Sequence, residues 1–475
     1  MIISENFPYK HSFFAIFEQL TKIPHGSGNT AEIARFCFDF AKSNGCDAVI
    51  DNVGNVIIKK AAGKGYEDSE PIIVQGHLDM VCEKTPESTH DFFVDPLKLH
   101  YDGKYISALD TTLGGDDGIA VAYALSLVAD KEIALPPLEI VLTMDEETGL
   151  FGAAGLDGSM LSGKKLINLD SEEEGILLCG CAGGLTATVT KKFKSENISG
   201  TKCRITLSGL KGGHSGCEIH RRRLNAALCL AKLIMNCGVE YNLVFYKSGT
   251  KFNAIPCNCV AEVVVADCED FVERLNTLFE KVVELAKGTD DQPKLELDFE
   301  DGSFECLSYE DSNRVISYLN TVPDGVIKEG DTGVITSLNT GVTDYENGQF
   351  YSEALIRSMV NDDLDVIAKQ VIKSANISKF NVDFSDRYSA WEYNEVSPLR
   401  DKMVEVYEKK FGKKPIVSTI HAGLECGVIS DKIPGMDAVS MGPDILDVHT
   451  VNERLDVESS IRCFEYLVEL LKSFK

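Results

Sequence analysis

Apolar residues recur at two different spacings over about the first 185 residues of the chain. Helical spacing predicts helices over residues 12–23, 30–45 and 118–130. Short continuous apolar runs predict buried strands over residues 71–75, 138–144 and 165–169. Residues 47–60 read as a β-hairpin with Gly54 in its turn. Helices and strands that alternate in this way are typical of an α/β domain.

From about Thr186 the pattern changes to alternating apolar and polar positions, which predicts half-exposed antiparallel strands with helices between them. Strands are expected over 185–197, 201–210 and 258–270, and helices over 221–238 and 271–288. After residue 388 the first pattern returns, with helices expected over 397–412 and 457–475 and a strand over 437–442. We therefore expect one domain formed by 1–185 and 388–475, interrupted by an inserted α+β domain at 186–387.

Composition and charge limit the kinds of molecule that the chain is expected to bind. The chain has 475 residues and a formal net charge of -27, which argues against nucleic acid or an anionic membrane as its main partner, since both attract basic surfaces. No apolar run approaches the ~20 residues of a membrane span, and the N-terminus lacks the pattern of a secretion signal. The 15 cysteines are an odd number scattered through apolar segments, as expected for free thiols in a reducing compartment. These features predict a cytoplasmic protein.

Acidic and histidine side chains follow each predicted strand of the first domain. His77 and Asp79 follow the first strand, Asp145, Glu146 and Glu147 follow the second, and Asp170 follows the third; Asp116 and Asp117 open the helix between the first two strands. Singly, each has an ordinary explanation as a helix cap, a solvated loop or a structural histidine. Together they lie at strand ends that share one edge of a sheet. Crowded carboxylates repel, and a mixture of carboxylate and imidazole suits zinc, cobalt or manganese.

Seven motifs in order then give a specific resemblance. The chain resembles the di-zinc aminoacylase and carnosinase family of metallopeptidases, and within it the bacterial dipeptidases, through "GHLDMV", "TLGGDDGIA", "MDEETGLFGAAGL", "NLDSEEEG", "GGHSG", "FNAIP" and "DVHTVNERL". The resemblance covers essentially the whole chain. It implies an α/β zinc-peptidase catalytic domain, with a mixed central sheet flanked by helices, interrupted by an α+β lid domain.

The resemblance also implies roles for residues of the catalytic domain. Asp116 would bridge two divalent metal ions, most naturally zinc, and each ion would have one histidine and one further carboxylate from the set His77, Glu147, Asp170 and His449. Glu146 would be the general base, and Asp79 would orient His77. The family pattern further implies a cis peptide bond between Asp116 and Asp117.

For substrate binding, the resemblance points to four residues outside the metal cluster. His214 would stabilise the oxyanion, and Asn253 and Arg357 would hold the terminal carboxylate of the substrate. Glu425 would pair with its free amino group. Relatives also suggest a homodimer formed through the lid domain.

The function predicted from these features is metal-dependent hydrolysis of unblocked L-dipeptides, with Xaa-His peptides as one substrate class. Two alternatives remain at this stage. An N-acyl amino acid deacylase of the same fold would not need an anion for a free amine. A catalytically silent metal-binding protein would not need the general base, Glu146.

Overall fold

The computed structural model describes residues 7–289, 291–331 and 333–475. The chain forms two compact units. The first contains the chain up to Cys181 together with Trp391–Thr419 and Leu424–Lys475, and the second contains Ala182–Ala390 and the short return Ile420–Gly423. The sequence pattern did not single out this return. Within the described ranges, no helix is both long and apolar enough to cross a membrane.

The first unit is built on a mixed sheet. In spatial order its strands are β1 (Asp47–Ile50), β2 (Val56–Lys60), β6 (Leu138–Thr143), β3 (Ile72–His77), β7 (Lys165–Asn168), β21 (Asp437–Ser440), β8 (Ile176–Cys181) and β20 (Ile416–Ile420). The predicted β1–β2 hairpin is confirmed, and its second strand runs antiparallel to β6. Strand β3 runs parallel to both β6 and β7. The carboxyl ends of these three strands therefore meet at one edge of the sheet.

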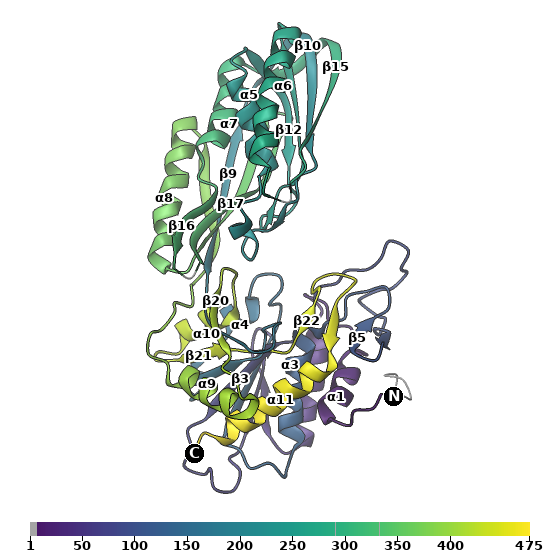
Figure 1. Ribbon diagram of the computed structural model, residues 1–475, viewed down its shortest axis with the longest axis vertical. Coiled ribbons are helices and arrows are strands. Elements are labelled where there is room, and N and C mark those ends of the chain that lie inside the picture. The colour runs from purple at the N-terminus through teal and green to yellow at the C-terminus, as the bar shows by residue number, and fades with distance from the viewer. Residues whose placement is uncertain (1–6, 290, 332) are drawn as a thin grey trace. The chain divides into compact units, whose positions relative to one another are not determined.

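Helices pack against this sheet (Figure 1). The helices and the sheet share one apolar core. These helices are α1 (Ser12–Leu20), α2 (Ala31–Ser43), α3 (Gly115–Ala129), α9 (Pro398–Phe411) and α11 (Val457–Lys472). Two shorter helices, α4 (Phe151–Gly155) and α10 (Glu425–Lys432), contact each other. The predicted α/β class, a mixed sheet flanked by helices, is confirmed. The sequence did not predict β8 and β20, nor a small sheet of β22 (Ile445–Leu446), β23 (Arg454–Asp456), β5 (Tyr105–Ala108) and β4 (Leu99–Tyr101).

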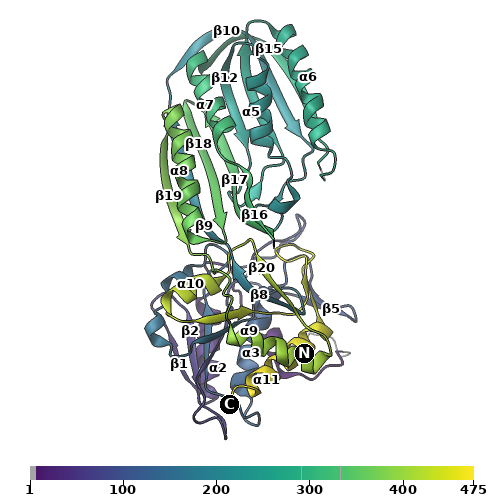
Figure 2. The same cartoon turned by 60° about the vertical axis from the view of Figure 1, so that its left-hand side comes forward.

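The second unit has an antiparallel sheet with helices over it (Figure 2). Its strands, in spatial order, are β15 (Lys294–Leu307), β10 (Ser195–Ser208), β14 (Cys259–Val265), β12 (Tyr241–Ser248), β17 (Gly333–Glu346), β18 (Gln349–Ser358), β9 (Gly183–Lys192) and β19 (Asn381–Tyr388), with β16 (Gly325–Gly330) also paired to β17. Its helices are α5 (Ala226–Asn236), α6 (Cys268–Leu285), α7 (Tyr309–Thr321) and α8 (Asn361–Ser378). A two-strand ladder joins β11 (Gly213–His214) to β13 (Ala254–Ile255).

One predicted helix of this unit begins later than the sequence suggested. The expected helix over 221–238 starts only at Ala226, because Arg222 takes a left-handed conformation with φ 52° and ends a short 3-10 turn. Asn225 then caps α5 by accepting hydrogen bonds from the backbone N–H groups of Ala227 and Leu228. Apolar spacing alone did not separate the turn from the helix.

Candidate metal centre

His77 is the last residue of β3 and is 1% exposed. Its imidazole Nε2 faces two carboxylates, lying 3.1 Å from Asp116 Oδ1 and 3.4 Å from Asp170 Oδ1. The other ring nitrogen, Nδ1, lies 3.0 Å from the backbone oxygen of Asp79. A proton on Nδ1 can be donated to that oxygen, which leaves the lone pair of Nε2 available to a metal ion.

A second group of ligand-type side chains lies around His449. Its Nε2 lies 2.8 Å from Glu147 Oε1 and 3.2 Å from Asp116 Oδ2. The two oxygens of Asp116 therefore face different histidines, Oδ1 toward His77 and Oδ2 toward His449. This divided arrangement is the geometry that a bridging carboxylate needs.

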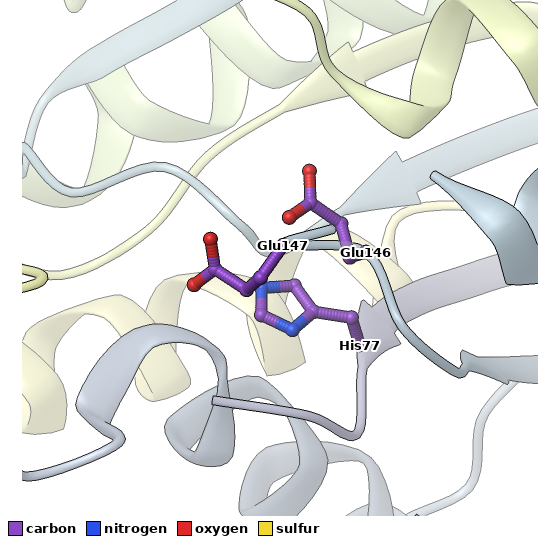
Figure 3. A group of neighbouring side chains, drawn as sticks. All are labelled: His77, Glu146 and Glu147. Atoms are coloured by element: carbon purple, nitrogen blue, oxygen red, sulfur yellow. The ribbon is translucent and has the colours of Figure 1, made fainter. Parts of the chain in front are cut away.

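The ligand atoms form three overlapping groups, within each of which all atoms lie within 4.8 Å of one another. The groups are His77–Asp116–Asp170, Asp116–Glu147–His449 and His77–Glu146–Glu147. Asp116 is shared by the first two groups. The third adds Glu146, whose carboxylate points in a different direction from that of Glu147 above the His77 ring (Figure 3). The structure thus brings together the five residues expected to bind metal.

The irregular loop that leads into the regular part of α3 gives Asp116 its direction. Asp116 has φ -85° and ψ 108°, which is not helical, and the peptide bond between Asp116 and Asp117 is cis, as the family pattern implies. Asp117 turns back to accept a hydrogen bond from the backbone N–H of His77 at 3.1 Å. A side chain at position 76 would collide with this carboxylate, so glycine is required there. The loop and the end of β3 are thereby held together.

The pKa values indicate that the cluster is short of positive charge. Burial raises the pKa of Asp170 to about 7 and also raises that of Glu147. Burial alone would lower the pKa of His449, but its hydrogen bonds with Asp116 and Glu147 raise it to about 11. These shifts favour bound protons at the three groups, and a divalent cation would supply the same positive charge. The donor set of imidazole and carboxylate fits zinc, cobalt or manganese.

Glu146 differs from its neighbours because, among the described residues, no hydrogen-bond donor contacts its carboxylate. Burial raises its pKa well above the usual value, and the charges of Glu147 and Asp170 add to this effect. A half-buried carboxylate with unused lone pairs and a raised pKa has the properties of a general base.

Asp79 contacts more than the histidine it was expected to orient. Its carboxylate accepts hydrogen bonds from the backbone N–H groups of Glu146 at 2.9 Å and Glu147 at 3.3 Å, and from Ser27 Oγ at 2.7 Å. Its Oδ1 lies 3.5 Å from His77 Nδ1, farther than its own backbone oxygen. Asp79 therefore fixes the loop that carries both glutamates as well as lying against His77.

Glu425, the first residue of α10, is fully buried in the first unit. Its Oε2 accepts hydrogen bonds from Thr143 Oγ1 at 2.6 Å and from Gln75 Nε2, whereas Oε1 has no partner. Burial raises its pKa to about 8. One oxygen is thus available to a ligand, but only if the residues around it move.

The other three predicted substrate residues belong to the second unit. Arg357 is 5% exposed; its Nη1 donates to Tyr388 Oη at 2.9 Å, and its Nε has no partner. His214 Nδ1 accepts hydrogen bonds from the backbone N–H groups of Gly216 and Cys217 at 3.3 and 3.0 Å, which assigns its proton to Nε2. The backbone oxygen of Asn253 accepts from Ser215 N at 2.9 Å and so ties this segment to the His214 turn.

The sequence did not single out a further histidine beside Arg357. A side chain at position 216 would lie 3.0 Å from the His214 ring, 3.2 Å from Arg357 Nε and against the backbone of His421, so these three residues surround Gly216. His421 Nε2 pairs with Ser337 Oγ at 2.8 Å, and its Nδ1 has no partner. Burial, together with the charges of Arg357 and His214, lowers its pKa to about 3.

Sequence reasoning missed two more residues at the candidate metal centre. Ser27, which holds Asp79, lies in a short glycine-containing loop with no recognised signal. Glu453 binds the loop before Asp116. It lies within "DVHTVNERL", a motif from which only His449 was assigned a role.

Comparisons with known proteins identify relatives of the chain. Residues 73–473 match the model of peptidase family M20/M25/M40. The cytosol non-specific dipeptidase of Escherichia coli (strain K12) is 36% identical over 467 residues, which cover 96% of either chain. The crystal structure of aminoacylhistidine dipeptidase from Vibrio alginolyticus has a TM-score of 0.86 at 32% identity, over 99% of both chains. An aminopeptidase from Bacillus cereus shares the fold, with a TM-score of 0.56 at 16% identity, over 99% of both chains.

Proposed function

Because this chain belongs to peptidase family M20/M25/M40, we propose that it is a metal-dependent dipeptidase that hydrolyses unblocked L-dipeptides. The observation that carries the proposal is the shared carboxylate of Asp116, which faces His77 on one side and His449 on the other, with Glu146 beside the same cluster. The names of the E. coli and Vibrio relatives support dipeptides, including Xaa-His, as substrates. The name of the E. coli relative also supports a cytoplasmic location.

Two divalent ions would be held by the residues of the first two ligand groups. One ion would bind His77, Asp116 and Asp170, and the other Asp116, Glu147 and His449. We propose zinc, with cobalt and manganese as alternatives, because imidazole and carboxylate ligands accept all three. Bound ions would polarise the peptide carbonyl and make a water molecule more acidic.

The protein's own groups would manage the proton. Glu146 would take a proton from the attacking water and return it to the leaving amine, as its unpaired carboxylate and raised pKa allow. Asp79 would keep Glu146 in place by holding its backbone N–H, and would restrain the His77 ring. The base and the ligands would thus be positioned before the substrate arrives.

The second unit would recognise the rest of the substrate as a lid. We assign Arg357 and Asn253 to the terminal carboxylate, since a buried guanidinium with an unpaired Nε–H can bind an anion. His214 would donate its Nε2–H to the oxyanion. The relatives' family further suggests that the lid forms a homodimer, which sedimentation of the purified protein would detect.

A substrate panel tests the proposed function directly. The purified protein should hydrolyse L-dipeptides, including Xaa-His, faster than tripeptides or N-acyl amino acids. Exhaustive chelation should abolish this activity, and zinc, cobalt or manganese should restore it. Activity that survives complete removal of metal, measured by elemental analysis of the same sample, would contradict the proposal.

Glu425 separates a dipeptidase from an N-acyl amino acid deacylase. If Glu425 Oε1 pairs with the substrate's ammonium group, Glu425→Gln should reduce kcat/KM for dipeptides by about 10-fold or more while leaving N-acyl substrates nearly unaffected, because a charge-assisted hydrogen bond is worth ~1.5–3 kcal/mol. Both substrate classes should be assayed on the same enzyme batch.

The full burial of Glu425 makes the opposite result informative as well. An equal loss on both classes would mean that the residue only supports Gln75 and Thr143 at the ends of β3 and β6. A parent enzyme that prefers N-acyl amino acids would favour the deacylase.

A further inference from the structure

Glu453 is a buried carboxylate that binds four successive backbone N–H groups. It is 2% exposed and lies four residues after His449, just before β23. Its Oε2 accepts from Leu113 at 2.7 Å and from Gly114 at 3.1 Å. Its Oε1 accepts from Gly115 at 2.7 Å and from Asp116 at 3.3 Å. A single side chain therefore satisfies the donors of the loop that ends in Asp116.

These donors need an acceptor because the backbone around the start of α3 is irregular, with non-helical torsion angles at Asp116 and Asp117. Buried backbone N–H groups outside a regular helix or strand need another hydrogen-bond partner. The N-cap of α3 is Gly114, which has no side chain to accept them. Glu453 supplies that acceptor from a segment more than 330 residues away in the sequence.

The glycines of the loop allow this close approach. Gly114 has φ +66°, which favours glycine, and a side chain there would lie 2.9 Å from Met80 Sδ. At Gly115 a side chain would lie 3.2 Å from Glu453 Oε1 itself. The pair of glycines thus makes room for the carboxylate against the backbone, immediately before the residue that faces both histidines.

We propose that Glu453 is a positioning residue that fixes the Asp116 carboxylate between His77 and His449. It fixes two ligands together, since it holds the Asp116 loop with its side chain and is separated from His449 by only three residues. Its own backbone N–H donates to Thr450 O at 3.1 Å, which keeps this connection compact. Asp116 and His449, two members of the Asp116–Glu147–His449 group that lie far apart in the sequence, are thereby aligned. The inference rests on the proposed metal binding.

Metal affinity of the purified full-length protein tests this role. Metal-free parent and variants would be titrated with zinc in competition with a chromophoric chelator, and with cobalt while its visible absorption is recorded. In Glu453→Gln one oxygen becomes an N–H₂ group that faces N–H donors, so we expect zinc affinity at the weaker site to fall about 10–100-fold, with an altered cobalt spectrum. Glu453→Asp keeps the charge and both acceptors and should recover part of the loss.

Glu139 offers a matched control in the same unit. It is 3% exposed and accepts the backbone N–H groups of Ser162 and Gly163, each at 2.9 Å, near the amino end of β6 and thus at the other end of the strand from Glu146. Glu139→Gln should lower thermal stability without changing zinc affinity. This separates a general loss of stability from a loss of ligand alignment.

The outcomes distinguish the inference from the function it rests on. A parent that binds neither zinc nor cobalt overturns the proposed function and the inference together. A parent that binds both ions, with unchanged affinity in folded Glu453→Gln, overturns the inference alone, as does an equal loss in Glu139→Gln. Should Glu453→Gln fail to fold, Glu453→Asp decides: weaker zinc binding supports the role, and parental affinity overturns it.

Discussion

Replacing Glu146 by glutamine should lower kcat on dipeptides by about 10²–10⁴-fold, the range typical of losing a general base. The amide keeps the size of the side chain but cannot accept the proton of water. Burial and the neighbouring charges of Glu147 and Asp170 raise the pKa of Glu146, so in the parent this group can hold the proton until the leaving amine takes it. Metal content and zinc affinity should stay at parental levels. Steady-state kinetics and elemental analysis of the same preparation measure both.

The neighbouring residue provides the control for this prediction. Glu147 Oε1 lies 2.8 Å from His449 Nε2 and belongs to the Asp116–Glu147–His449 group. Glu147→Gln should therefore weaken metal binding, whereas Glu146→Gln should not. The ligand atoms of Glu146 also lie within 4.8 Å of those of His77 and Glu147, so a Glu146→Gln protein that loses metal would show that Glu146 is a ligand. A variant with parental kcat would exclude it as the base.

The convergence of the candidate metal ligands could be predicted because most of them follow strongly patterned strands. The apolar run before His77 marks a buried strand, and the runs before Glu146 and Asp170 mark its two parallel neighbours. The carboxyl ends of neighbouring parallel strands lie at the same edge of a sheet. The side chains that follow these strands were therefore expected to lie close together. His449 was different: no local pattern placed it, and its assignment came from the family resemblance alone.

The elements that were missed have little local signal. Strands β22 and β23 are two and three residues long, and they exist because they pair with each other and with β5, from a distant part of the chain. Glu453 was missed for the same reason, because its hydrogen-bond partners are backbone groups more than 330 residues away in the sequence. An acidic residue in a short polar segment resembles any solvated loop until the fold supplies those partners.

Two predicted substrate residues illustrate the limits of assigning roles from motifs. Glu425 was expected to meet an ammonium group, yet the fold buries it completely against Thr143 and Gln75. Arg357 was expected to bind a carboxylate, and the fold gives it a buried site with an unpaired Nε and a second histidine, His421, close by. A motif identifies the residue type, whereas burial and partners decide how a ligand can reach it.

Replacing Asp116 by asparagine should have the largest effect on metal binding. Its Oδ1 faces His77 and its Oδ2 faces His449, and it belongs to both groups proposed to hold an ion. The amide nitrogen of asparagine is a poor metal ligand, so one substitution should weaken metal binding at both sites. The loss of metal affinity should exceed the ~10–100-fold that is typical when a residue hydrogen-bonded to a ligand is removed. Dipeptidase activity should fall to background. Asp170→Asn, which belongs to one group, should weaken one site and leave the other.

Asp117 is the matched control, because it is the adjacent buried carboxylate but belongs to none of the three ligand groups. Asp117 Oδ2 accepts the backbone N–H of His77, and the carbonyl oxygen of asparagine can do the same. Asp117→Asn should therefore keep two equivalents of zinc after dialysis, whereas Asp116→Asn should keep fewer than one. If Asp116→Asn retained two tightly bound ions, Asp116 would not be shared between them. Asp116 is a proposed ligand and Asp117 is not, so a ligand role predicts a larger loss of zinc in Asp116→Asn. Equal losses in both variants would mean instead that metal binding depends on the total negative charge of the cluster.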